Sequence, residues 1–334
     1  METHSLSKFE RLQAVMRGEQ PDRPPVSLWR HFPVDDQSPE GLAAATIAFQ
    51  QAFDFDFIKV TPSSSYCLRD WGISDHWLGN PEGTRQYDKR VIQSPQDWRR
   101  LPVLDPRRGV LKDQVTCLNI LNKHFSGQVP LIMTIFNPLS QARNLAGADR
   151  LLDHLRNFPE EVQVGLEIIA RSTRVFLESC LETGISGIFL AVQHAQASVL
   201  TIEEYQHFGR KYDLGLLEAS QDLWMNILHL HGEDIYFDQF LDYPVQILNW
   251  HDRKTSPTLA EGLQRFQGVV CGGLKQWDTL VLGTPVQVQS EAQDALNSTS
   301  GKRFILGTGC VMPITAPYGN TLAARRAVDA FRYA

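Results

Sequence analysis

The sequence predicts an α/β protein folded as a single (β/α)8 TIM barrel. Eight short apolar segments have the length and composition of buried strands, and amphipathic, helix-like stretches separate them. Barrels of this kind typically hold about 250 residues, so a chain of 334 residues suffices for one barrel with an insertion. The predicted strands are Val26–Trp29, Phe57–Val60, Val129–Ile135, Gly187–Val192, Met225–Leu230, Val245–Trp250, Val269–Leu274 and Phe304–Gly307.

Helix start signals precede several of the intervening stretches. Ser7–Glu10 has the capping-box pattern, a serine followed three residues later by a glutamate, and predicts an N-terminal helix over residues 5–18. Thr201–Glu204 and Thr258–Glu261 open two later helices in the same way, and Ser38 stands before a Pro-Glu start. Strands and helices therefore alternate along the chain, as parallel βα units require.

The surplus length lies mainly in residues 61–128, after the second predicted strand. This stretch carries Trp71, Trp77 and Trp98 but no clear βα unit. We expect it to form an elaborated loop region over the barrel mouth, so that residues 1–334 make up one domain.

Composition excludes several functional classes. A net charge of −6 leaves no basic tract to neutralise the phosphates of a nucleic acid. No run of about 18 apolar residues is present, and residues 1–20 contain no apolar stretch of the kind found in signal peptides. The five cysteines are odd in number and scattered, which suits a reducing compartment. We expect a cytoplasmic enzyme that binds neither nucleic acid nor membrane and acts on a small molecule.

Polar residues collect directly after the predicted strands, where (β/α)8 barrels hold their chemistry. Five of the ten histidines stand at such strand ends. We expect catalytic roles for Arg30, His251 and Asp252, with His251 or Asp252 acting as a general base or as a further metal ligand. The residues expected to bind substrate are Arg30, His31, Asn137, His194 and Trp250.

His229 and His231 end the fifth predicted strand, and Cys310 follows the eighth. Because side chains alternate along a strand, the two histidines point to the same face. Two imidazoles and one thiolate would make a three-ligand zinc site with one position left open for chemistry. The alternatives are a pair of hydrogen-bonded histidines without metal and a cysteine that is simply buried. Glu233 and Asp234 are candidates for orienting the imidazoles.

The chain resembles the uroporphyrinogen decarboxylase superfamily over nearly its whole length. The superfamily has a (β/α)8 barrel, which agrees with the independent count of strands. The segments that carry the resemblance are Glu10–Glu19, Pro21–Val26, Phe55–Val60, Thr201–Tyr205, Gly272–Leu274 and Ile305–Cys310.

The superfamily holds two chemistries, and the true decarboxylases depart from this chain. Their first strand carries a Met-Arg-Gln-Ala-Gly-Arg signature, of which only Arg30 remains here. Their aspartate after the second strand is replaced by Thr61–Ser64, and their tyrosine and serine after the third and fourth strands fall near Asn144 and Ala195. Cofactor-free decarboxylation of uroporphyrinogen III therefore stays as an alternative only.

The resemblance to the methylcobamide:coenzyme M methyltransferases of the superfamily is closer at the site. Those enzymes carry His-x-Cys after strand five and a cysteine after strand eight; His229 and Cys310 match, and His231 replaces the first cysteine. The resemblance implies zinc, a thiol acceptor and a methyl-corrinoid donor on a partner protein. Since dimers are common in the superfamily, a homodimer is one expectation.

The replacement of a cysteine by His231 changes the charge at the expected site. Two histidines and one thiolate leave zinc with a formal charge of +1, so zinc polarises water or a carbonyl better and holds a thiolate harder. This exchange favours other Lewis-acid chemistry over thiol methylation, whereas the resemblance to the methyltransferases implies transfer to a thiol. From the resemblance we predict a zinc-dependent methyl or alkyl transferase with a thiol acceptor. A metal-dependent hydrolase or lyase and a non-catalytic binding barrel are further alternatives.

Overall fold

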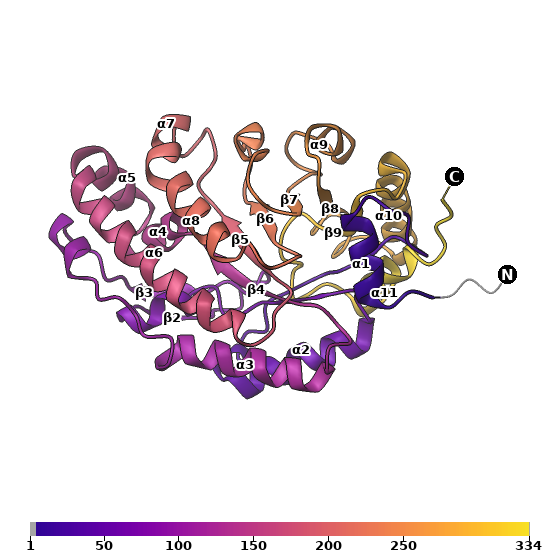
Figure 1. The fold of residues 1–334 in the computed structure, drawn as a ribbon, viewed down its shortest axis with the longest axis horizontal. Helices are drawn as coiled ribbons and strands as arrows, with labels where there is room; N and C mark the ends of the chain where they lie inside the picture. The colour runs from indigo at the N-terminus through magenta and orange to yellow at the C-terminus, as the bar shows by residue number, and fades with distance from the viewer. Residues whose placement is uncertain (1–4, 334) are drawn as a thin grey trace.

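A parallel seven-stranded sheet forms the centre of the molecule. The computed structural model describes residues 5–333, and residues 1–4 and 334 lie outside the description. Neighbouring strands in the sheet follow chain order and are all parallel, and the sheet curls around its own interior (Figure 1). In order, the strands are β1 (Ile58–Val60), β4 (Leu131–Phe136), β5 (Gly187–Val192), β6 (Ile227–Leu230), β7 (Ile247–Trp250), β8 (Val269–Leu274) and β9 (Phe304–Thr308).

The segment around Val26 bridges the two edge strands of this sheet. Val26 makes an isolated parallel bridge with Leu306 of β9, and its carbonyl accepts a hydrogen bond from the N–H of Asp56, just before β1. The predicted strand Val26–Trp29 is thus in its expected place but is reduced to one bridge. The predicted α/β class and TIM-like arrangement are confirmed; seven of the eight predicted strands are regular.

Helices flank the sheet on its outer side (Figure 1). The predicted capping boxes are present at Ser7, Thr201 and Thr258. The α-helices are α1 (Lys8–Met16), α2 (Pro39–Phe53), α3 (Gly109–Phe125), α4 (Pro138–Ala146), α5 (Ala148–Asn157), α6 (Pro159–Leu181), α7 (Ile202–Tyr205), α8 (Lys211–Ala219), α9 (Leu259–Arg265), α10 (Pro285–Thr299) and α11 (Tyr318–Ala327). Among the described residues, no helix combines the length and apolarity needed to cross a membrane.

The interior of the curled sheet is filled with apolar side chains at the amino ends of its strands. Leu12 and Val15 of α1 belong to this cluster, together with Ile247, Val269 and Ile305 from the starts of β7, β8 and β9. The N-terminal helix therefore packs against the amino ends of the strands. The carboxyl ends, where the polar residues were predicted, stay free for a site.

The stretch 61–128 contains short elements ahead of the long helix α3. They are the 3-10 helices Tyr66–Trp71 and Pro95–Arg100 and an antiparallel pair of strands, β2 (Ser74–His76) and β3 (Gln86–Lys89). Trp71 and Trp98 are buried in the main core. Residues 82 and 84–87 and Arg90 of this stretch line the cavity described next.

Candidate metal centre

Three histidines and one cysteine meet at the carboxyl ends of the strands. His229 lies in β6, His231 directly follows β6, His251 follows β7, and Cys310 follows β9. One ligand atom from each lies within 4.8 Å of all the others. The structure therefore brings together the three predicted ligands, and it adds His251 to them.

Two separations within this cluster match the edges of a tetrahedral zinc site. Nε2 of His251 lies 3.4 Å from Nδ1 of His231, and Sγ of Cys310 lies 3.6 Å from the same nitrogen. Zinc bonds of about 2.0–2.1 Å to nitrogen and about 2.3 Å to sulfur place tetrahedral ligands roughly 3.4–3.6 Å apart. These two pairs of donor atoms are thus spaced for a shared ion, and all four donors lie within 4.8 Å of one another.

Asn249 determines which nitrogen of His229 faces the cluster. Its Nδ2 donates to the carbonyls of Cys271 and Thr308, at 2.9 and 3.0 Å, so its Oδ1 must be the atom 2.7 Å from Nδ1 of His229. Nδ1 of His229 therefore carries the proton and donates to that oxygen. Nε2 is left with a bare lone pair that is buried without a hydrogen-bond partner. A metal ion would satisfy this orphaned acceptor.

Burial keeps the four candidate ligands electrically neutral when no cation is present. It lowers the pKa of His251 to about 3 and lowers the pKa values of His229 and His231, so all three imidazoles are neutral near pH 7. Burial also raises the pKa of the Cys310 thiol to about 11. Neutral imidazoles are the form that binds metal, whereas Cys310 must lose its proton to a bound cation.

A glycine lets the last strand end approach β7 closely. A Cβ on Gly309 would lie 2.7 Å from both the Cα of His251 and the carbonyl oxygen of Trp250. Those are backbone atoms that cannot move aside easily, so Gly309 permits the contact that seats Cys310 beside the histidines.

The cluster opens into a cavity of about 440 Å³ with a positively charged wall. Lys59, Arg90 and Arg143 line it, and none of the three has an ion pair with a carboxylate among the described residues. The carboxylate of Glu82, which also lines the cavity, accepts a hydrogen bond from Trp277. The wall therefore favours a negatively charged ligand.

Lys59 is the most buried of these cations. Its ammonium lies 4.4 Å from the ring centroid of Phe189 and 3.3 Å from Oγ1 of Thr61. Burial lowers its pKa to about 7, while the nearby Cys310 acts in the opposite direction. Phe189 in turn stacks on the ring of His229 at 5.1 Å, so Lys59 and the cluster share one aromatic wall.

Two of the residues expected to bind substrate lie at cavities. His31 lines the main cavity, and its Nδ1 is 2.9 Å from the carbonyl oxygen of Pro62. His194 lines a neighbouring chamber that also touches His231. Burial lowers the pKa of each of these two histidines to about 3.

Trp250 and Asn137 are not brought to either cavity. Trp250 follows Asn249 in β7, so strand alternation turns its ring outward, where it packs on Phe237 and donates to the carbonyl of Pro257. Asn137 caps α4: its Oδ1 accepts from the N–H of Ser140. Each has a structural role that accounts for its burial.

Arg30 and Asp252, expected to be catalytic, also lie outside the two cavities. The guanidinium of Arg30 packs 5.1 Å from the ring centroid of Phe32 and donates to the carbonyl of Ile314. Oδ1 of Asp252 accepts from the N–H of Gly273, on the helix side of β8. Both side chains point away from the sheet interior.

Glu233 and Asp234 do not orient the imidazoles. Both are exposed, and Asn249 has the expected role for His229. Asn249 and Lys59 were missed because each stands inside an apolar strand segment. A lone polar residue in such a segment was the signal that could have identified them.

The chain matches one family model over almost its whole length. The model, uroporphyrinogen decarboxylase (URO-D), matches residues 7–331. Among known proteins, the methylcobamide:CoM methyltransferase MtbA of Methanosarcina acetivorans is 20% identical over 234 residues, which cover 70% of this chain and 67% of that protein. A methylated-thiol–coenzyme M methyltransferase of Methanosarcina mazei is 22% identical over 264 residues, covering 78% and 67%.

Solved structures support the fold. A methyltransferase from Methanosarcina mazei superposes with a TM-score of 0.85 at 16% identity, covering 97% of this chain and 98% of that one. A B12-independent methionine synthase from Shewanella sp. W3-18-1 gives a TM-score of 0.59 at 12% identity, covering 91% and 95%. At these identities the likeness concerns the arrangement of strands and helices.

Proposed function

Since the chain belongs to the uroporphyrinogen decarboxylase family and has methyltransferases among its homologues, we propose that it is a zinc-dependent methyl or alkyl transferase with a thiol acceptor. The proposed zinc ligands are Nε2 of His229, Nδ1 of His231, Nε2 of His251 and Sγ of Cys310. The observation that carries the proposal is the convergence of these donors, one of them an orphaned and buried imidazole nitrogen, at the wall of a cavity.

Zinc in this site would supply Lewis-acid stabilisation of the acceptor thiolate. The protein residues would orient a zinc ligand, add positive charge beside the thiolate and limit the access of water. Asn249 holds His229 in the ligating tautomer, and Lys59 and Arg143 add positive charge that favours a thiolate over a thiol. Phe189 and Ala191 give the cavity an apolar wall that limits water.

His251 is the ligand that we expect to give way to the acceptor. Four protein ligands make a closed zinc site, whereas a catalytic site keeps one position for substrate. His229 is held by Asn249, but the contacts of the described residues include no hydrogen bond to Nδ1 of His251. Among the same residues Nε2 of His231 has no such bond either, but Nδ1 of His231 contacts both His251 and Cys310, so His251 is the more peripheral of the two rings.

The proposed donor is a methyl-corrinoid carried by a partner protein. The name of one relative, a methylcobamide:CoM methyltransferase, supports this choice. The ligand set also affects the acceptor. Three neutral imidazoles and one thiolate leave zinc with a formal charge of +1, whereas a site with two thiolates leaves it neutral. The proposed site would therefore hold the acceptor thiolate more strongly.

Metal analysis together with a transfer assay tests the proposal. The purified protein should contain about one equivalent of zinc, and incubation with methylcobalamin and a thiol should give the methyl thioether. His229→Ala and Cys310→Ala should lose both zinc and transfer, whereas Cys117→Ala, which removes a buried thiol outside the site, should keep both. Less than about a tenth of an equivalent of zinc, unchanged in Cys310→Ala, would contradict the proposal.

A further inference from the structure

A second, smaller chamber adjoins the metal centre. Its volume is about 240 Å³, and it shares His231, Gln193 and Arg143 with the main cavity. Whole-ligand pockets usually measure about 300–1,000 Å³, so a chamber of this size is suited to part of a ligand. Because these three side chains line both spaces, we interpret the chamber as a subsite beside the main cavity.

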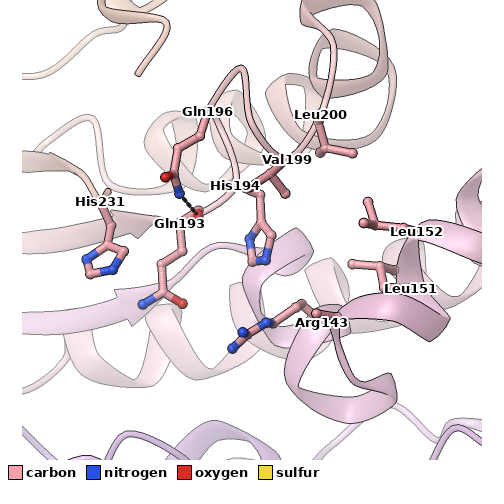
Figure 2. A pocket seen from close by; sticks show the side chains of 10 residues that line it. Arg143, Leu151, Leu152, Gln193, His194, Gln196, Val199, Leu200 and His231 are labelled. Atoms are coloured by element: carbon pink, nitrogen blue, oxygen red, sulfur yellow. Dashed lines mark hydrogen bonds between the residues drawn. The ribbon is translucent and has the colours of Figure 1, made fainter. Parts of the chain in front are cut away.

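The lining of this chamber is divided into a polar and an apolar side (Figure 2). His231, Gln193 and Arg143 lie on the side toward the metal centre. Leu151 and Leu152 of α5 lie on the other side, joined by Val199 and Leu200 of the loop after β5. A ligand that extends from the metal centre into the chamber would meet hydrogen-bonding groups first and aliphatic side chains beyond them.

Among the described residues, one imidazole nitrogen at the chamber lacks a hydrogen-bond partner, and one guanidinium lacks a carboxylate partner. Nδ1 of His194 is buried without a hydrogen-bond partner. The guanidinium of Arg143 donates only to the side-chain oxygen of its neighbour Asn144, at 3.1 Å, and has no carboxylate partner among the described residues. A guanidinium with free donors is the usual protein partner of a carboxylate or a similar planar or tetrahedral anion.

We propose that the chamber is the specificity pocket of the acceptor, and that the acceptor is an anionic thiol with a short branched alkyl group. This rests on the proposed function, which supplies the thiol. The thiolate lies at the metal centre, the anionic group pairs with Arg143, and the alkyl group fills the space between α5 and the loop at Val199. The main cavity then stays open to the methyl donor.

Thiol binding to the Co²⁺-loaded protein tests the two recognition features separately. Cobalt accepts the same nitrogen and sulfur ligands as zinc, and its absorption reports a bound thiolate. The probe 2-mercapto-4-methylpentanoate has both features, mercaptoacetate lacks the alkyl group, and 3-methylbutane-1-thiol lacks the anion. The first should bind at least about tenfold more tightly than either of the others. Equal affinity for the first two probes would overturn the proposal.

Substitutions at Val199 and Arg143 test where the alkyl group and the carboxylate of the probe bind. Val199→Trp fills the chamber and should remove the advantage of the alkyl group while leaving mercaptoacetate binding unchanged. Val286→Trp, the same change at an exposed valine of α10, should alter neither. Arg143→Gln should remove the advantage of the carboxylate, and Arg143→Lys should restore part of it. An equal loss for both probes in Val199→Trp would place the alkyl group elsewhere.

A thiol-free ligand separates this inference from the proposed function. If the protein takes up no Co²⁺, the proposed function fails, and the chamber is tested on metal-free protein with 4-methylpentanoate by NMR saturation transfer. Transfer to the isopropyl protons in the unchanged protein and in Val286→Trp, but not in Val199→Trp, would support the chamber as an alkyl pocket. Absence of transfer, or transfer that persists in Val199→Trp, would overturn it.

Discussion

The protonation of one histidine is decided by a residue that does not belong to the ligand cluster. The side-chain amide of Asn249 donates hydrogen bonds to two backbone carbonyls, so only its oxygen is available to His229. The imidazole is thereby held with a bare nitrogen toward the cluster. Outer partners of this kind fix the tautomer and orientation of a ligating imidazole and so contribute to metal affinity.

Asn249→Ala should therefore weaken zinc binding without removing a ligand. The expected loss is about 10–100-fold, because His229 can then adopt either tautomer and turn. Competition with a zinc-chelating dye measures the affinity, and near-UV circular dichroism checks that the protein is folded. Asn297→Ala, on the exposed face of α10, is the control. Unchanged affinity in folded Asn249→Ala would show that another group orients His229.

Lys59 is a destabilising residue that the site retains. Burial lowers the pKa of its ammonium to about 7, from an ordinary value of 10.5, so the folded state disfavours the charged form. Below pH 7 the side chain is charged in both states, and the full penalty applies. As the pH rises from 7 towards 10.5, only the unfolded chain stays charged, so the penalty declines.

Lys59→Met should accordingly stabilise the protein and impair its function. The gain at pH 6 should be about 2 kcal/mol or more and should shrink at pH 9.5, as urea unfolding at the two pH values would measure. Lys123→Met, at an exposed position of α3, should change stability little at either pH. A loss of stability at pH 6, or a gain that is independent of pH, would contradict this account of Lys59.

At the scale of elements, strand register assembles the site. His229 of β6 pairs with Asn249 of β7, and Asn249 pairs with Cys271 of β8. This register places the amide beside the imidazole that it orients. Because the strands are parallel and follow chain order, their carboxyl ends share one rim, which collects His231, His251 and Cys310.

The sequence correctly predicted which residues stand at the carboxyl ends of the strands. It was less successful in predicting which face of the sheet each side chain occupies. Continuous apolar runs identified the strands, and the strand ends identified His229, His231 and Cys310. Trp250 and Arg30 were expected at the cavity because a strand end alone does not tell which face a residue takes. Asn249 and Lys59 were missed because only the packed interior shows that a polar group inside an apolar run meets a partner or a cavity.

The closure of the sheet depends on one buried carboxylate. Asp56 is fully buried, accepts from the guanidinium groups of Arg11 and Arg23, and accepts from the N–H of Val26 at 2.7 Å. It thereby ties α1 and the Val26 segment to the start of β1. This explains how a segment reduced to one bridge stays in place between two edge strands.

Asp56→Ala should cost about 3–5 kcal/mol of unfolding free energy, since it leaves the buried guanidinium of Arg11 without one of its partners and frees the N–H of Val26. Urea unfolding would measure the difference. Asp54→Ala removes a largely exposed carboxylate that pairs with Lys8 and should cost less than about 1 kcal/mol. Similar losses of unfolding free energy in the two variants would show that the Asp56 network does not keep the Val26 segment in place between the edge strands.

At the scale of the whole molecule, the proposed zinc site joins three strand ends that lie far apart in sequence. A ligand that binds only the folded state raises stability by mass action, by about 2.7 kcal/mol at a hundredfold excess over its Kd. Zinc should therefore stabilise the protein as a whole, through His229 in β6, His251 after β7 and Cys310 after β9.

Saturating zinc should raise the melting temperature of metal-stripped protein by several degrees, and a chelator should reverse the shift. Magnesium should have no such effect, because it prefers oxygen ligands and the cluster offers nitrogen and sulfur. His229→Ala removes the donor that has no other partner, so its melting temperature should not respond to zinc. Differential scanning calorimetry measures all three. An equal shift with magnesium, or a zinc shift that persists in His229→Ala, would place the bound ion away from this cluster.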